Sequence, residues 1–393
     1  MKKLFVAVLA LAALAACNKE NVDTFVTSNQ KAVSITIVNP ETRAVVEAGG
    51  VDDVKAVGAN GEVLAKGTSK VVAQANELQF LFANEQGMIV DIRPYSNGVP
   101  ATTNTDNNVV VTFHNVAESA WQVAVVRYGD MAALKVGEKL SAVRDEAKDE
   151  AKNAGVVIDS ITLYAAAQLS YTNDTVCVEH TEFKLYKASL DLAPLFSRFE
   201  INRVKCTDLG EVTYKVATGV DTTVVKGYDE LTLASIKFGS EATYTYNFAA
   251  DTKLFGQLVY TDGVAGERAD YDNTRCYNFG TDTEALAWNI AEQAAPSYTL
   301  DADNKKVASY PMVLSLNAIA YDSNIDTDTT VTVVRVNDKD GNPVETFEAG
   351  KIYNMDLDFA ESNLDSFTDG ICVEVTVTIS DWEVVVVEPE FLS

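Results

Sequence analysis

Cys17 has the clearest chemical setting of any side chain in this sequence, because it directly follows Leu14-Ala15-Ala16. A thiol in this pattern can be acylated, for example with palmitate, and becomes the new N-terminus once the chain is cut before it. The chain opens with two lysines and an apolar run over residues 4–13, too short for a permanent membrane span. The pattern predicts a signal peptide at 1–16 and lipidation at Cys17 of an exported bacterial protein. An ordinary signal peptide with a chance cysteine is the alternative.

Residues that could catalyse a reaction are scarce. The chain has two histidines, His114 and His180, both in strand-like sequence and neither with the partner four residues away that a zinc helix supplies. There is no Gly-x-Ser-x-Gly elbow, phosphate-binding loop or dinucleotide fingerprint. The 57 carboxylates allow many acidic pairs, so none can be singled out as a glycosidase pair. We therefore expect no enzyme activity and no cofactor, and we interpret both histidines as structural.

Neither the acidic loop at 338–343 nor the cysteines have the spacing of a metal site. The loop lies between two strand-like runs, and its glycine falls two residues early for a calcium-binding EF-hand, so we predict a hairpin turn. The sequence has no Cys-x-x-Cys pair. In an exported protein, the remaining cysteines can form disulfides or stay as buried free thiols, and the sequence does not distinguish these two states. The cysteines after Cys17 are Cys177, Cys206, Cys276 and Cys372.

The charge balance excludes two classes of partner. The 393 residues carry a formal net charge of −26, from 31 Lys and Arg against 57 Asp and Glu. Such a surface repels nucleic acid and anionic lipid at long range. A protein of this charge stays soluble at a crowded cell surface.

Alternation of apolar and polar residues dominates the chain and predicts an all-β protein with minor α structure. The length allows two domains, each with its own core. The clearest strand patterns lie at 109–113, 121–126, 183–186, 242–246, 330–336 and 373–379.

One helix and one domain boundary are predicted. Residues 138–153 place Leu140, Val143 and two alanines on one stripe, and a glycine follows at 155, which indicates a surface helix on the first domain. A new alternating segment begins after Pro194 without a flexible linker, so two tandem β-sandwiches should abut. We assign 17–43 to a lipidated propeptide, 44–194 to the N-terminal sandwich and 195–393 to the C-terminal sandwich.

The two ends carry the most informative patterns. In the leader, Val33, Ile35 and Ile37 point to one side of a short strand, and Arg43 and Ala44 follow it. Both ends could simply be strands of ordinary sandwiches. The C-terminal segment has two apolar rows, Val373, Val375, Val377 and Ile379, then Trp382, Val384 and Val386.

Together these features resemble a fimbrillin, the major subunit (type V pilin) of lipoprotein-derived surface fimbriae. The resemblance covers the whole chain in layout and is carried by the Cys17 motif, the leader ending in Arg43-Ala44, and the C-terminal Ser-Asp-Trp-Glu-Val segment. The segment 195–201, Leu-Phe-Ser-Arg-Phe-Glu-Ile, is similar to the domain junction of that family.

The resemblance implies a polymerisation mechanism. The lipidated precursor would reach the outer membrane, where an arginine-specific protease would cut between Arg43 and Ala44. The cut would detach the strand containing Val33, Ile35 and Ile37 and leave a groove for a C-terminal donor strand from another copy. The donor is expected within 373–387, with 382–387 as our preferred part. The implied partners are other copies, fimbrial anchor and tip subunits, and surface ligands of host or bacterial cells.

Two alternatives belong to other classes. A fimbrial tip or anchor component, acting as an adhesin, would lack either the donor ending or the cleavable leader. A surface glycan-binding lipoprotein would keep its lipid and stay monomeric.

Overall fold

β-Strands make up most of the described part of the chain. The computed structural model describes residues 26–38, 59–65, 70–101, 108–127, 134–153, 162–179, 181–208, 228–239, 244–255, 276–320, 326–360, 371–381 and 383–387. The predicted all-β class with minor helix is confirmed. The helical elements of the described residues are α1 (Leu140–Asn153) and two 3-10 turns, η1 (Ala75–Glu77) and η2 (Tyr95–Asn97).

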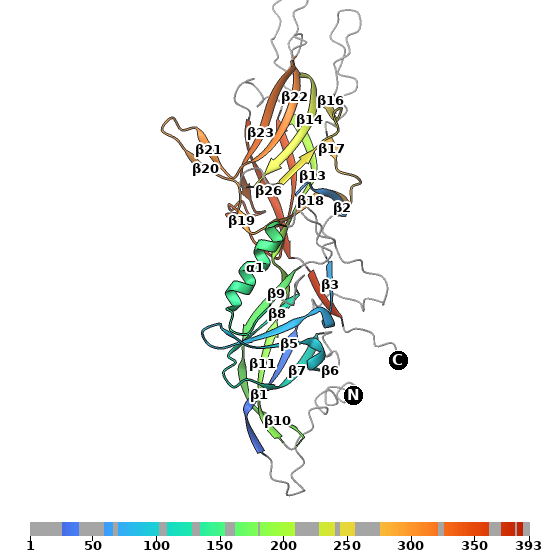
Figure 1. Ribbon diagram of the computed structural model, residues 1–393. Coiled ribbons are helices and arrows are strands. Elements are labelled where there is room, and N and C mark those ends of the chain that lie inside the picture. The colour runs from blue at the N-terminus through green and yellow to red at the C-terminus, as the bar shows by residue number, and fades with distance from the viewer. Residues whose placement is uncertain are drawn as a thin grey trace, which may run out of the picture.

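Two five-stranded sheets form a sandwich in the lower half of Figure 1. The strands of the first sheet are β1 (Val26–Ile37), β6 (Val99–Ala101), β7 (Val109–Val116), β10 (Ser170–Val178) and β11 (Thr181–Leu190), in the order β10-β11-β1-β7-β6. The strands of the second are β4 (Gln79–Ala83), β5 (Ile89–Pro94), β8 (Gln122–Arg127), β9 (Leu163–Gln168) and β12 (Ala193–Pro194), in the order β12-β9-β8-β4-β5. Phe80 of one sheet meets Phe113 of the other at 4.8 Å between ring centroids, within the core between them.

α1, the predicted surface helix, packs against part of the outer face of the second sheet. Leu140 and Val143 are 5% and 1% exposed and pack against Leu81, Ala124 and Val126. The narrow stripe therefore covers part of a sheet face and leaves the rest of that face to other residues.

An eleven-stranded sheet forms the upper half of the molecule (Figure 1). Phe238 and Trp288 lie on strands far apart in the sheet order, yet their ring centroids are 5.0 Å apart. The sheet therefore folds over a single core. Its strands are β2 (Glu62–Ala65), β13 (Phe196–Asp208), β14 (Tyr228–Phe238), β15 (Tyr244–Asn247), β16 (Lys253–Phe255), β17 (Cys276–Asn278), β18 (Glu284–Ala291), β22 (Met312–Ala320), β23 (Asp326–Asn337), β25 (Lys351–Ala360) and β26 (Ile371–Asp381).

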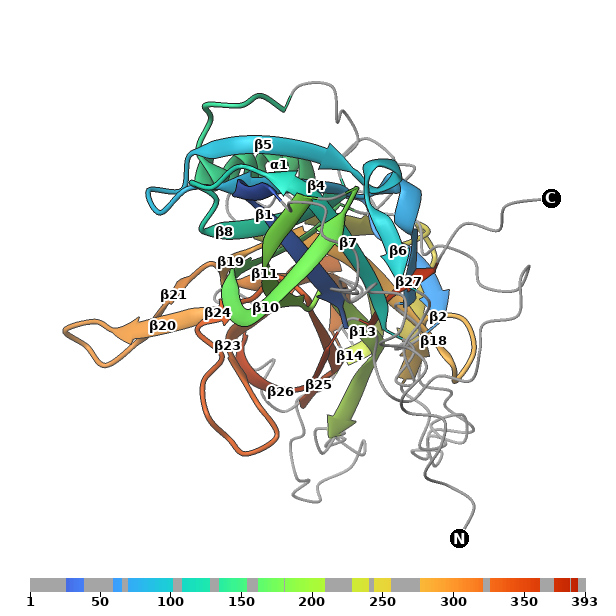
Figure 2. The same ribbon diagram turned by 90° about the horizontal axis from the view of Figure 1, so that it is seen from below.

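Three two-stranded ladders complete the described residues. They are β19 (Gln293–Ala294) with β24 (Thr346–Phe347), β20 (Ser297–Leu300) with β21 (Lys306–Ser309), and β27 (Glu383–Val387) with β3 (Lys70–Gln74). The β20–β21 hairpin projects from the body in both views (Figures 1 and 2).

The start of β13 joins the two halves without a linker. Leu195 belongs to the core beneath α1, Phe196 to the core between the five-stranded sheets, and Phe199 to the core of the large sheet. One short segment therefore contributes side chains to three cores. The division of domains at 194 stays a prediction. Residues 62–65, which that division places in the first domain, form β2 and pair with β18 in the large sheet.

A buried ion pair lies on β13 at this joint. Arg198 Nε lies 3.1 Å from Glu200 Oε1, and both side chains are 1% exposed. Asn354 Nδ2 on β25 donates to Glu200 Oε2 at 2.9 Å. Burial lowers the pKa of Arg198, and the Glu200 carboxylate opposes that shift. Each of these buried charges is stabilised by the opposite charge of its partner in place of water. Loss of either side chain should therefore destabilise this part of the sheet.

We expect Glu200→Leu to lower the free energy of unfolding by about 3–5 kcal/mol, because it leaves the Arg198 charge buried without its carboxylate. Urea unfolding of the purified chain measures this. The matched double variant Arg198→Met/Glu200→Leu should recover most of the loss, since it removes both charges. A single variant as stable as the parent would contradict the interpretation.

Candidate functional site

The leader strand β1 lies inside the first sheet, paired along both edges. On one side it runs parallel to β11, with Val33 opposite Tyr186 and Ile37 opposite Leu190. On the other side it runs antiparallel to β7, with Val33 opposite Phe113. Figure 2 shows β1 between the two. A strand from the predicted propeptide is thus a central element of the sandwich.

The side chains of β1 alternate as their sequence predicts. Val33, Ile35 and Ile37 are 0% exposed and belong to the core between the five-stranded sheets. Ser34 and Thr36 are half-buried on the opposite face. The burial expected of the apolar row is confirmed, whereas its role as a detachable strand stays a prediction.

Lys31 is a site residue that the sequence pattern does not reveal. It is 8% exposed, its Nζ donates to the Ala120 carbonyl at 2.5 Å, and that Nζ lies 4.4 Å from the centroid of the Tyr186 ring. Burial lowers the pKa of the Lys31 ammonium, and the Glu118 carboxylate raises it in part. The ammonium thereby anchors the start of the apolar part of β1, through groups that are distant in sequence.

Ile35→Ala is expected to lower the free energy of unfolding of the uncut chain by about 2–5 kcal/mol, because it opens a cavity at a fully buried position. Thermal or urea unfolding measures this. Thr36→Ala, on the half-buried opposite face, is the matched control and should cost under about 1 kcal/mol. Equal stabilities of the Ile35→Ala and parent chains would show that β1 contributes little to the sandwich.

The first C-terminal row lies in β26, a central strand of the large sheet. β26 runs parallel to β23 and antiparallel to β25. Val375 and Val377 are 5% and 1% exposed, whereas Ile379, near the end of the strand, is 40% exposed. Val373 shares the strand, opposite a residue of the same type at 333. This half of the C-terminal segment therefore fits the alternative that it is an ordinary strand of the sandwich core.

The second C-terminal row lies outside the main sheets. Val384 and Val386 belong to β27, which runs parallel to β3 with Val384 opposite Val71. Within the described residues β27 pairs with no other strand. Trp382 lies outside the described residues, as do Cys17, Arg43 and Ala44.

The described residues hold no group of three or more His, Cys, Asp or Glu side chains able to bind a metal ion. At the acidic loop, Asp338 Oδ1 accepts hydrogen bonds from the backbone N–H groups of Asp340 and Asn342, as the predicted hairpin turn requires. These bonds lower the pKa of the Asp338 carboxyl. His114 is half-buried on β7, and burial lowers its pKa. His180 lies outside the described residues.

None of the helices in the described part of the chain has the length and apolarity needed to cross a membrane.

No protein-family model and no curated protein matches this chain. Solved structures do. A fimbrilin from Porphyromonas gingivalis W83 is 13% identical, with 91% of this chain and 99% of that chain covered and a TM-score of 0.41. A protein assigned to cell adhesion from Parabacteroides distasonis is 10% identical, with 91% and 99% covered and a TM-score of 0.43. A C-terminally truncated tip fimbrial protein from Porphyromonas gingivalis is 11% identical, with 89% and 100% covered and a TM-score of 0.30.

These similarities assign no role to any residue, because every TM-score is below 0.5. Within this chain, the leader row and the two C-terminal rows lie in three different sheets: β1 is in the first five-stranded sheet, β26 is in the large sheet, and β27 pairs with β3. They do not meet in the monomer.

Proposed function

We propose that this protein is the shaft subunit of a cell-surface fimbria. It is exported as a lipoprotein through Cys17 and is held at the outer membrane. Cleavage between Arg43 and Ala44 then frees it, and the cut subunits polymerise by strand exchange into an extracellular fibre that contributes to adhesion.

The observation that carries this proposal is the position of β1. A segment that precedes the proposed cleavage point supplies a central strand, paired on both edges and buried at Val33, Ile35 and Ile37. A segment that served only as a lipid attachment or a spacer would not need a row of buried apolar side chains. A strand built into the fold and then removed leaves a defined vacancy for another strand.

The vacancy would have two properties of a strand acceptor. The edges of β7 and β11 would lose their backbone partners, and the apolar slot between them would be exposed to water. A donor that buries three Val or Ile side chains there gains roughly 5–9 kcal/mol before entropy and backbone pairing. Strand addition of this kind is a recurring mode of recognition.

We assign the donor role to β27 rather than β26. Withdrawing β26 would break its ladders to β23 and β25 and expose Val375 and Val377. β27 forms one short parallel ladder with β3, and an isolated two-stranded pairing is marginal in water. It can therefore leave its own subunit at low cost.

Such a contact joins the end of one copy to the start of another. A head-to-tail contact between different surfaces does not close a dimer and gives an open filament when repeated. The partners are thus other copies along the shaft, anchor and tip subunits at its ends, an arginine-specific protease, and ligands on host or bacterial surfaces.

Arginine-specific proteolysis of the purified chain, followed by an unheated denaturing gel, tests the proposal. A ladder of polymers should form from the cut chain and not from the uncut chain. A cut chain that remains monomeric would contradict the shaft role and would favour a tip, an anchor or a glycan-binding lipoprotein.

A further inference from the structure

A cavity of about 440 Å³ opens where the start of α1 meets the second sheet. Its walls are the first turns of α1, the β4–β5 turn, and strands β8 and β9. This volume is at the lower end of the ~300–1,000 Å³ of small-molecule sites. The cavity lies far in sequence from the fimbrial elements proposed above and does not involve β1 or β27.

The cavity exists because small residues of β9 lie beside the helix. Ala166 pairs with Ala124 of β8, and both sit on the outer face of the sheet. Ala124 is buried in the same core cluster as Leu140 and Val143, whereas Ala166 stays exposed and lines the cavity. A larger side chain at 166 would fill the space.

Hydrogen bonds from backbone and side-chain groups hold the walls in place. The Leu140 N–H donates to the Gly87 carbonyl at 2.9 Å, which ties α1 to the β4–β5 turn. Asn84 Oδ1 accepts from the Met88 N–H at 2.9 Å, and Gln122 Nε2 donates to the Asn84 carbonyl at 3.1 Å. Gly87 has φ +77°, which favours glycine at this position of the turn. The site is therefore organised before any ligand arrives.

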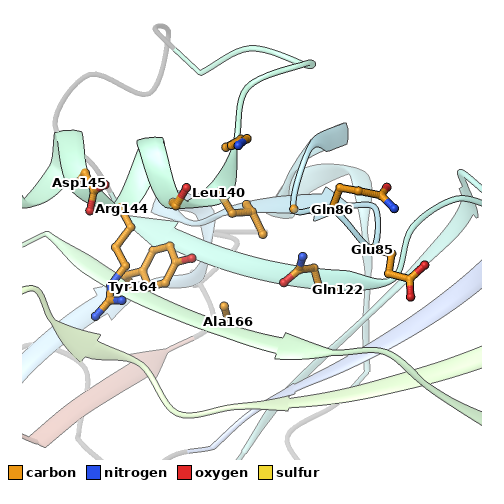
Figure 3. A pocket seen from close by; sticks show the side chains of 11 residues that line it. Glu85, Gln86, Gln122, Leu140, Arg144, Asp145, Tyr164 and Ala166 are labelled. Carbon is orange, nitrogen blue, oxygen red and sulfur yellow. The ribbon is translucent and has the colours of Figure 1, made fainter.

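Polar groups lie at the two ends of the cavity, and apolar groups lie on its sides. Figure 3 shows the Tyr164 hydroxyl and the Gln122 carboxamide pointing toward each other, with Leu140 and Ala166 on opposite sides between them. Within the described residues the Tyr164 hydroxyl and the Gln122 carboxamide oxygen make no hydrogen bond that would occupy them. The Tyr164 phenol is protonated at neutral pH and can donate. Burial raises its pKa further.

Charge selects the class of ligand. Lys139 and Arg144 in the lining are balanced by Glu85 and Asp145, so the cavity has no net preference for an ion. The net charge of −26 repels anions from the whole surface. We propose that this cavity binds a neutral pyranose sugar, whose ring faces are apolar and whose edges carry hydroxyls. The ring lies between Leu140 and Ala166, and its hydroxyls reach Tyr164 and Gln122.

Saturation-transfer NMR on the purified, uncut full chain tests this with methyl glycosides of glucose, galactose, mannose and N-acetylglucosamine. At least one should bind with a Kd of about 1 mM, as expected for a ligand of this size. Tyr164→Phe should weaken binding about fivefold, the effect of losing one hydrogen bond. Because the monomer is used, the result is independent of fibre assembly.

Ala166→Leu should abolish the signal by filling the cavity. Ala294→Leu is the matched control, because it makes the same substitution at an exposed alanine of another strand, β19, outside the lining, and it should bind like the parent. No signal from any neutral glycoside at about 10 mM, tenfold above the expected Kd, would overturn the site. Tighter binding of N-acetylneuraminic acid than of every neutral glycoside would overturn the ligand class. If Ala166→Leu does not fold, an unchanged affinity in Tyr164→Phe overturns the site.

Discussion

Arg43→Ala is expected to stop fibre formation completely and to leave a folded, lipid-anchored monomer. The uncut chain keeps β1 tethered to its own sandwich, at an effective concentration of order mM. A donor from another copy must then displace a strand that is paired on both edges and buried at Ile35 and Ile37. Electron microscopy of cells, with membrane fractionation and N-terminal sequencing of the protein, measures the outcome.

Two controls give this experiment its specificity. Arg43→Lys keeps the charge and should behave like Arg43→Ala, because the protease reads the guanidinium. Arg93→Ala removes an arginine of β5 that is ion-paired to Asp91, and fibres should form normally. If the Arg43→Ala variant still formed fibres with Ala44 at their N-terminus, the protease would not require Arg43, and this prediction would be wrong.

Truncation after Asp381 is expected to give a subunit that accepts a donor but cannot donate. This truncation preserves all of β26, including the pairing of Asp381 with Lys351, and removes β27. The large sheet should therefore stay folded. Alone, the truncated chain should remain monomeric after cleavage at Arg43. Mixed with the full chain, it should shorten fibres in proportion to its mole fraction, measured by electron microscopy.

The matched control is truncation after Val387, which removes the last six residues and keeps β27. Its fibres should have normal length. Normal fibres from the chain ending at Asp381 would exclude β27 as the donor. A chain ending at Asp381 that unfolds at lower denaturant would instead indicate that β27 is a fixed part of the monomer.

Much of the local structure could be predicted from the sequence, because side-chain alternation reports which face of a strand is buried. The strand predicted at 109–113 lies within β7, the one at 330–336 within β23 and the one at 373–379 within β26. The helix predicted from 138 begins at Leu140. The apolar row of the leader faces the core as expected.

Pairing partners could not be predicted, because a two-residue period specifies a face and not a neighbour. Val63 lies in a stretch assigned to the first sandwich, yet it pairs with Leu286 in the large sheet. Arg198 and Glu200 alternate with apolar neighbours as exposed residues would, yet both are buried. The sugar cavity depends on Ala166 lying beneath a helix that begins 26 positions earlier in the chain, which no local pattern encodes.

The placement of β1 between two neighbours also bears on mechanical strength. Its ladder to β11 extends from Val26 to Ile37 and its ladder to β7 from Lys31 to Ile37, on opposite edges of one strand. A donor seated in that slot and pulled along its own axis would be loaded in shear, so both rows of hydrogen bonds must yield together rather than unzip one by one. Resistance to force is then set by the rate of rupture rather than by equilibrium affinity. Fibres of this kind would withstand fluid flow without a covalent bond between subunits.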